Sequence, residues 1–430
     1  MKDFMRFTLT DFACIDNAEL NIDKITVVGG HNSTGKSSAS KLLFSFLKAN
    51  SSKRKELAIE TIDLQIRMLL FQFNDYSRLN PNSSFYNIFS KDFFELYEDL
   101  RFTNNLESTL DVYNTIKEIY SKSDINNGFK QEFDESIKKI DNLINIIDED
   151  SFPLYVSIMR KLLNSEFSNI DMGIVKLEGM FKEIPYKFMI DFEKFNLEDD
   201  SGFSYNGGFS LNDVVYIDST SVLDLTQSYG LQNTSHFRFL EECLRPEADE
   251  SNVLFDEKIN ESIIRIEKEI SNIIDGEFKY QNGELYFIQR NGGEFLMKNT
   301  ASGIKQVGII QILLAHRKLK ENSFLIIDEP EVNLHPKWQI KLAEILALLA
   351  QGLNIQIYIN SHSPMFIEAI SIFSKYYHLD ENTNFYLTKK QDGCLNFIKI
   401  ANDDMGAVYE NLAEPYGELD KINAKLSYRH

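Results

Sequence analysis

Short apolar runs separated by polar residues open the chain and predict β-strands. Two of them are Phe7–Leu9 and Ala18–Ile22, and a third, more continuous run covers Ile25–Val28. The third run ends in Gly29 and Gly30. A continuous apolar run that ends at a glycine turn is typical of a buried strand leading into a loop.

Helical spacing replaces this pattern further along the chain. A helix is predicted to begin near Lys36, and several helices follow, interrupted by polar loops, between residues 51 and 209. The apolar positions that share a helical face are Leu42, Leu43, Phe46 and Leu47; Val112, Ile116 and Ile119; and Phe133, Ile137, Ile140 and Ile144. We therefore expect a helical insertion over 51–209, in which no catalytic motif is found.

Strands and helices alternate in the second half of the chain. A strand at Asp213–Ile217 is followed by a helix over Ile259–Ile273, for which Gly276 is placed as the C-cap, and by a β-meander over Phe278–Met297. The remaining predicted elements are a helix at 302–318, a strand at Phe324–Ile327, a helix at Lys337–Leu353, a strand at Ile355–Ile359 and a short helix at Phe366–Phe373. Strands joined through long helical crossovers predict a parallel sheet.

A glycine-rich loop lies between the third strand and the first helix. Its sequence from Gly30 to Ser37 fits the pattern G-x-x-x-x-G-K-[ST], in which backbone N–H groups and the helix N-terminus hold phosphate oxygens. Lys36 can reach the terminal phosphates and the Ser37 hydroxyl can bind Mg²⁺. We expect ATP and Mg²⁺ as cofactors, and the expected nucleotide-binding residues in this loop are Gly30, Asn32, Ser33, Gly35, Lys36, Ser37 and Ser38.

Two carboxylates follow the apolar strand Phe324–Ile327. Asp328 at the strand end suits Mg²⁺, which makes Ser37 and Asp328 the candidate metal ligands, and Glu329 is the candidate base that polarises the attacking water. Ser302 with Gly303, and His362 within Ser361–Pro364, are unremarkable when taken singly. Ser302 would be an ordinary N-cap, and a lone histidine after a strand is usually structural.

The order of these motifs along the chain resembles that of a known protein family. A phosphate loop, a helical insertion, A-S-G-x-x-Q, an apolar strand with D-E, and S-H-S resemble the ATP-binding-cassette ATPases, in particular the head domains of the RecF, SMC and Rad50 kind. The run Asp328–Pro336 is similar to the D-E-P-E-x-x-L-H-P run of the OLD-type and related AAA ATPases of bacterial anti-phage defence systems.

The resemblance implies an α/β fold, a two-lobed ABC-type ATPase head. An antiparallel β lobe and a mainly parallel RecA-like sheet would be formed by residues 1–50 and 210–375, with 51–209 as the inserted helical domain and 376–430 as a C-terminal extension. It also implies that Ser302 and Gly303 contact the γ-phosphate of ATP held by an opposite subunit. Glu329 and His362 would be catalytic, with His362 as the switch histidine, and Leu334–Pro336 would lie in a loop that crosses the dimer interface.

One element of the family pattern has no assignment. A glutamine that contacts Mg²⁺ is expected between the phosphate loop and Ser302. Gln72 and Gln227 are the candidates, and neither has a sequence context that distinguishes it.

The amino-acid composition indicates which binding partners and which compartment to expect. The formal net charge is −20, which favours solubility and protein partners over nucleic acid, although a local basic groove is compatible with it. Cys14, Cys243 and Cys394 are scattered and no apolar stretch is long enough to span a membrane, so we expect a cytoplasmic protein. Charged segments such as Lys53–Lys55 are explained as solvated helix faces.

Three functions remain open at this stage. The chain is interpreted first as an ATPase sensor that forms a nucleotide-sandwich dimer and regulates a separate nuclease or toxin. The second interpretation is a RecF-like or SMC-like DNA repair ATPase, and the third, a transporter subunit, is disfavoured by the long insertion and the L-H-P run. No nuclease activity is expected in this chain, because the acidic pairs Asp380-Glu381 and Asp403-Asp404 lack the context of a Toprim metal site.

Overall fold

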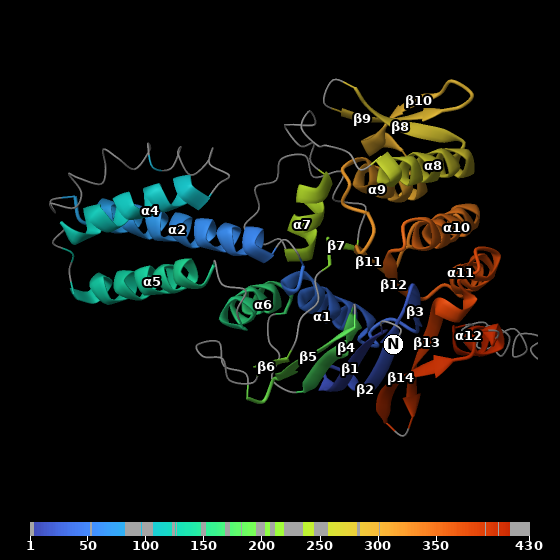
Figure 1. Ribbon diagram of the computed structural model, residues 1–430, viewed down its shortest axis with the longest axis horizontal. Helices are drawn as coiled ribbons and strands as arrows, with labels where there is room; N and C mark the ends of the chain where they lie inside the picture. The colour runs from blue at the N-terminus through green and yellow to red at the C-terminus, as the bar shows by residue number, and fades with distance from the viewer. Residues whose placement is uncertain are drawn as a thin grey trace, which may run out of the picture. The chain divides into compact units, whose positions relative to one another are not determined.

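The computed structural model describes most of the chain. The described residues are 4–51, 54–81, 96, 106–122, 125, 127–147, 152–167, 173–181, 183–194, 203–206, 211–218, 235–244, 257–281, 284–300, 302–391, 393–402 and 404–412. They belong to two compact units, one formed by Met1–Ser52 with Lys161–His430 and the other by Lys53–Arg160 (Figure 1). Gln227 lies outside the described residues, as does the part of the tail after Leu412.

A single large sheet organises the first unit. Its strand order is β6-β5-β4-β1-β2-β14-β13-β3-β12-β11-β7. The strands are β1 (Phe4–Phe12), β2 (Ile15–Ile22), β3 (Ile25–Gly29), β4 (Ile174–Phe181), β5 (Ile184–Asp191), β6 (Phe203–Asn206), β7 (Val214–Ile217), β11 (Phe324–Asp328), β12 (Gln356–Ser361), β13 (Thr383–Gln391) and β14 (Cys394–Ile400).

The two halves of this sheet differ in strand direction. Strands β6, β5, β4, β1 and β2 pair antiparallel, whereas β13, β3, β12, β11 and β7 pair parallel. The predicted α/β fold, with an antiparallel β part and a mainly parallel part, is confirmed.

Apolar helices cover the parallel part of the sheet. Every residue of β3, β7 and β11 is buried, as expected for strands that are covered on both faces. The helices that contact the parallel strands are α1 (Lys36–Ala49), α7 (Ser235–Leu244), α10 (Pro336–Gly352) and α11 (Pro364–Tyr376). Against these helices pack α8 (Glu257–Ile274), α9 (Ser302–Ala315) and α12 (Met405–Leu412) (Figure 1). This packing fixes the carboxyl ends of the central strands, where the candidate site lies.

The expected meander forms a separate small sheet. Strands β8 (Gly276–Gln281), β9 (Glu284–Gln289) and β10 (Glu294–Leu296) pair antiparallel in the order β10-β9-β8. The placement of Gly276 as a C-cap is wrong, because Asp275 takes the left-handed conformation after α8, with φ of 59°, and Gly276 begins β8. A Cβ at Gly276 would lie 2.6 Å from Phe287, so the glycine permits close packing instead of a turn.

The expected helical insertion over 51–209 is helical only in its first part. The second unit contains α2 (Arg54–Leu79), α4 (Leu106–Ser121) and α5 (Asn127–Ile146), and α6 covers Phe152–Glu166. Beyond residue 173 the chain instead forms β4, β5 and β6, and β4 pairs with β1 from Phe4↔Met180 to Thr10↔Ile174. Pairing with a strand far away in the sequence decides this conformation, and local helical spacing cannot reveal it.

No helix among these described segments is both long enough and apolar enough to cross a membrane.

Candidate functional site

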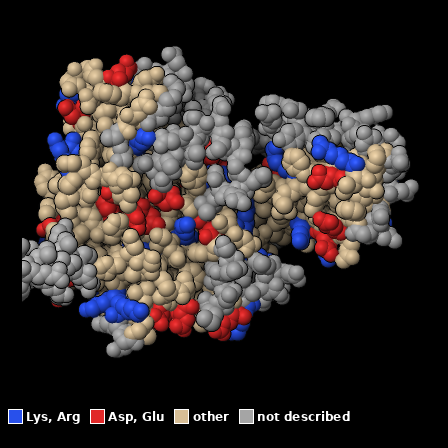
Figure 2. All heavy atoms as spheres, turned by 180° about the vertical axis from the view of Figure 1, so that it is seen from behind, with Lys and Arg blue, Asp and Glu red and all other residues tan. Residues whose placement is uncertain are grey.

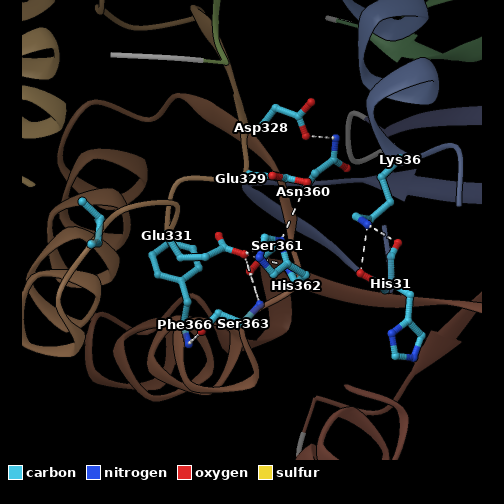
Figure 3. A network of polar contacts seen from close by, with 12 residues as sticks. His31, Lys36, Asp328, Glu329, Glu331, Asn360, Ser361, His362, Ser363 and Phe366 are labelled. Carbon is cyan, nitrogen blue, oxygen red and sulfur yellow. Dashed lines mark hydrogen bonds and ion pairs between the residues drawn. The ribbon is translucent and has the colours of Figure 1, made fainter. Parts of the chain in front are cut away.

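The parallel strands bring the predicted motifs to one edge of the sheet. In register, Asp328 at the end of β11 lies beside Asn360 of β12, and Ser361 lies beside Gly29 of β3. The phosphate loop, the two carboxylates after β11 and the histidine loop therefore meet at the carboxyl ends of neighbouring strands (Figure 3).

The phosphate loop has the backbone geometry that its sequence predicts. Ser33 and Gly35 are left-handed, with φ of 61° and 77°. Gly35 is the N-cap of α1 and no side chain caps this helix, so its first N–H groups remain available at the loop. Gly30 has a different role, because a Cβ there would lie 1.8 Å from the hydroxyl oxygen of Thr388.

Lys36 extends across the loop. Its Nζ donates hydrogen bonds to the carbonyl oxygens of Gly30, at 2.9 Å, and of His31, at 2.6 Å (Figure 3). Burial lowers the pKa of Lys36, and the carboxylates of Glu329, Asp328 and Glu331 act against this shift. The ammonium group is thus placed where phosphate oxygens would replace the two carbonyl groups, within electrostatic reach of all three acids.

Asp328 is held from both sides. The side-chain amide of Asn360 donates to its Oδ1 at 2.9 Å, and the hydroxyl of Tyr216, at the end of β7, donates to its Oδ2 at 3.2 Å. Ser40 of α1 joins both partners, since its Oγ lies 2.8 Å from the Tyr216 hydroxyl and accepts from Asn360 at 2.9 Å. The hydroxyl of Ser40 donates to the carbonyl oxygen of Ser37, which links Asp328 to the first turn of α1.

Sequence reasoning missed Tyr216, Asn360 and Ser40. A usable signal existed, because Tyr216 lies near the end of one strand predicted from the sequence and Asn360 directly follows another. Burial and the nearby charge of Asp328 raise the pKa of Tyr216 well above its ordinary value. Tyr216 therefore keeps its proton and remains a hydrogen-bond donor to the carboxylate.

Glu329 and His362 face each other at the exposed side of the site. Their side chains are 35% and 37% exposed, and His362 Nδ1 lies 3.7 Å from Glu329 Oε1. The backbone of Glu329 is left-handed, with φ of 50°, and its N–H donates to the carbonyl oxygen of Asn360. An acid held in this sparsely populated conformation at a strand end is typical of functional sites.

The turn after Glu329 leads into α10. Asn333 is left-handed, His335 is the N-cap of α10, and Pro336 occupies the first turn of that helix. The Nδ1 of His335 accepts a hydrogen bond from the N–H of Lys337. The L-H-P run is therefore a helix start, as proline after an N-cap favours.

Ser302 and Gly303 begin α9 and are not part of this constellation. Gly303 packs against Trp338 of α10, and among the contacts that the structure describes it has no hydrogen bond or ion pair to the phosphate loop. Gln72 lies on α2 of the other unit, where its amide donates to Glu132. The structure thus brings together the phosphate loop, Asp328, Glu329 and His362 of the expected site.

The residues present fit a magnesium nucleotide. Lys36 and the uncapped N-terminus of α1 offer positive charge and donors for phosphate oxygens, while Ser37 and Asp328 would offer hard oxygen ligands. No group of three or more His, Cys, Asp or Glu side chains among the described residues could hold a metal by itself. This donor set suits Mg²⁺, which typically binds through one or two protein ligands together with substrate phosphates.

Comparison with known proteins gives one family. The profile of the AAA ATPase domain matches residues 5–367. No curated protein matches the chain.

Several solved structures are similar to the chain. An SMC head domain from Thermotoga maritima is 10% identical, covering 93% of this chain and 99% of its own, with a TM-score of 0.42. An SMC head bound to the C-terminal winged-helix domain of ScpA is 10% identical, with coverages of 94% and 99% and a TM-score of 0.44. An SMC head with an extended coiled coil, bound to the C-terminal domain of ScpA derived from Pyrococcus furiosus, is 8% identical, with coverages of 96% and 100% and a TM-score of 0.39.

Proposed function

The chain belongs to the AAA ATPase domain family, and we propose that it binds ATP at the loop Gly30–Ser37 and hydrolyses it with Glu329 as the general base. The observation that carries this proposal is the convergence of Lys36, Asp328 and Glu329 at one edge of the sheet, where the three groups interact electrostatically. A chance match to a phosphate-loop pattern would not place two strand-end carboxylates beside the lysine.

Each of these groups has a distinct task in the proposed reaction. Lys36 exchanges its two backbone carbonyl partners for phosphate oxygens. Ser37 and Asp328 bind Mg²⁺, which neutralises the phosphate charge when bound. Glu329 accepts a proton from the attacking water. We assign His362, whose Nδ1 lies 3.7 Å from Glu329 Oε1, to the terminal phosphate, as the family resemblance implies.

The proposed active form is a dimer with two nucleotides between two copies. Gly303 packs on Trp338 within its own chain and has no described bond to its own phosphate loop. We assign Ser302 and Gly303 to the nucleotide of a second copy, as the family resemblance implies. ATP would then control association of the chains, and hydrolysis at Glu329 would release them.

The biological role that we propose is regulation of a separate effector, a nuclease or a toxin, in prokaryotic anti-phage defence. The run from Asp328 to Pro336 supports this role, and so does the net charge of −20, which favours protein partners. A DNA repair ATPase is the second candidate. On the face drawn in Figure 2, the Lys and Arg side chains of described residues are interspersed with Asp and Glu and form no continuous basic band of the kind that follows a phosphate backbone.

The dimer is tested with the variant Glu329→Gln. Without its base, hydrolysis should slow by about 10²–10⁴-fold, and the protein with ATP should have twice its apo mass in light scattering. Lys36→Ala is the control that should lose nucleotide binding and stay at the apo mass. If Glu329→Gln binds ATP and yet keeps its apo mass, the sandwich proposal is wrong.

The role is tested by co-expressing the tagged chain with its neighbouring genes. A stable complex with a nuclease or toxin that dissociates during ATP hydrolysis supports the effector role. Salt-sensitive, ATP-dependent binding of duplex DNA without such a partner supports the repair role instead.

A further inference from the structure

Glu331 is a buried carboxylate to which the proposed reaction gives no task. It lies in the turn between β11 and α10, and its side chain is 3% exposed. Its Oε1 accepts three hydrogen bonds from one loop: the Ser361 hydroxyl at 2.8 Å, the His362 N–H at 2.6 Å and the Ser363 N–H at 3.1 Å (Figure 3). Two separate segments of the site are therefore joined through a single oxygen atom.

Burial of this carboxylate is costly and needs a compensating arrangement. Burial raises the pKa of Glu331, and hydrogen bonds from the backbone of His362 and from Ser361 act against this shift. The N-terminus of α11, which begins at Pro364, adds favourable electrostatics for an anion. The second oxygen, Oε2, is buried and receives no hydrogen bond from the described residues, so the attachment depends on Oε1 alone.

A second attachment runs parallel to the first. The Ser363 hydroxyl donates to Gln339 Oε1 at 2.9 Å, and the Gln339 amide donates to the carbonyl oxygen of Leu334 at 3.2 Å. Ser363 Oγ also caps α11 by accepting from the N–H of Phe366. The histidine loop, residues 361–363, is thus held by Glu331 in the turn and by Gln339 of α10.

The consequence of these attachments is the position of the His362 ring. Its Nδ1 lies 3.3 Å from Glu331 Oε1 and 3.7 Å from Glu329 Oε1. The same ring nitrogen therefore faces the buried acid that holds its backbone and the exposed acid proposed as the base. A shift of the loop would separate His362 from Glu329.

We propose that Glu331 is a positioning residue, which fixes the histidine loop to the turn after Asp328 so that His362 and Glu329 stay opposed. This inference rests on the proposed function, because the opposed pair matters only for hydrolysis. None of the three hydrogen bonds to Glu331 involves the phosphate loop. The backbone hydrogen bond from the Gly30 N–H to the carbonyl oxygen of Ser361 does not involve the Glu331 side chain. Nucleotide binding and hydrolysis should therefore respond differently to its removal.

Hydrogen exchange tests the attachment without reference to activity. In the apo protein, Glu331→Ala should accelerate amide exchange over residues 361–366 and leave residues 36–49 of α1 unchanged. Glu368→Ala is the matched control, since it removes a carboxylate of α11 whose described hydrogen bond is with Tyr409. Unchanged exchange at 361–366 in Glu331→Ala would refute the attachment.

Enzyme kinetics tests whether Glu331 affects ATP hydrolysis. Glu331→Ala should lower kcat by about 10–100-fold, because small misplacements of reacting groups have effects of this size. Its affinity for a fluorescent ATP analogue should change by less than about threefold. Glu331→Gln should keep most of the activity, since the amide oxygen can accept the same three hydrogen bonds.

A double substitution separates positioning from general loss of stability. Because Glu331 acts through His362, Glu331→Ala should lower kcat little further in a His362→Ala background. Ser361→Ala removes one of the three donors and provides a milder variant, with an intermediate kcat, if Glu331→Ala does not fold. Additive losses in the double variant, or equal losses in Glu331→Gln and Glu331→Ala, would overturn the proposal. An inactive wild-type protein would instead contradict the proposed function, while hydrogen exchange would still decide on the attachment.

Discussion

The side-chain amide of Asn360 lies 2.9 Å from Oδ1 of Asp328, across two adjacent parallel strands. The same amide donates to Ser40 of α1, so that one buried side chain connects the helix of the phosphate loop with the candidate metal ligand. The orientation of Asp328 is therefore set by its neighbours before any ion binds.

Replacement of Asn360 by Ala should impair metal use more than nucleotide binding. Partners that orient a metal-binding carboxylate typically change metal affinity or activity by about 10–100-fold when they are removed. We expect the Mg²⁺ concentration for half-maximal ATP hydrolysis to rise by about tenfold or more. Asn384→Ala is the control, because Asn384 is a largely buried asparagine of β13 that donates to Asn21, outside the Asp328 network. An unchanged Mg²⁺ requirement in Asn360→Ala would contradict this role.

Replacement of Gly303 by Ala should disturb the start of α9. The new Cβ would lie 2.8 Å from Trp338 Cγ, and overpacking of this kind costs about 1–3 kcal/mol. The chain has one tryptophan, so selectively excited tryptophan fluorescence reports on the surroundings of Trp338, and we expect a shift of its emission with a lower melting temperature. Gly406→Ala in α12 should change neither the tryptophan emission nor the melting temperature, because the atom nearest the new Cβ lies 3.4 Å away.

A buried histidine should make stability depend on pH. His236 contacts Glu166 through Nδ1, at 2.6 Å, and Asp218 through Nε2, at 2.9 Å. Burial by itself would lower the pKa of His236, but the hydrogen bonds and charges of Asp218 and Glu166 outweigh it and raise the pKa. A raised folded-state pKa stabilises the protein fully below the unfolded value of about 6.5 and loses this contribution as the pH rises through the folded-state value.

Unfolding by urea at a series of pH values measures this contribution. His236→Gln should be less stable than the wild type at pH 6, and the difference should shrink as the pH rises. His316→Gln is the matched substitution, because it replaces another histidine, whose Nδ1 lies 3.0 Å from the carbonyl oxygen of Cys243. A difference that is constant with pH would show that folding does not raise the pKa of His236, which contradicts the prediction.

Breaking the buried ion pair between Lys48 and Asp213 should strongly destabilise the protein. The two side chains are 4% and 2% exposed, with 3.1 Å between Lys48 Nζ and Asp213 Oδ1, and they join α1 to the start of β7. Removing one partner of a buried pair leaves an uncompensated charge and costs about 3–5 kcal/mol, so Lys48→Met should lower the free energy of unfolding by about this amount. Lys279→Met breaks an exposed pair and should cost less than about 1 kcal/mol in the same urea titration. Similar losses in the free energy of unfolding of Lys48→Met and Lys279→Met would contradict this prediction.

Local sequence was sufficient for the parts of the site that depend on neighbouring residues. The phosphate loop needs glycine at a left-handed position and an uncapped helix directly after it, and both are encoded between Gly30 and Ser37. The strand Phe324–Asp328 is recognisable because four apolar residues precede the acid. The alternation of strands and helices likewise predicted the parallel part of the sheet.

Contacts between distant segments decided the rest. The strands after residue 173 are fixed in the sheet by the pairing of β4 with β1, although the alternation of apolar and polar residues in Val175–Glu178 is a local strand signal. Tyr216, Asn360 and Glu331 acquire their roles only when parallel strands place them beside Asp328 and His362. The sequence by itself determined which residues can bind phosphate and metal, since that chemistry resides in short motifs. Only the tertiary structure decided which buried side chains hold them in place, because hydrogen bonds between strand ends join residues that are far apart along the chain.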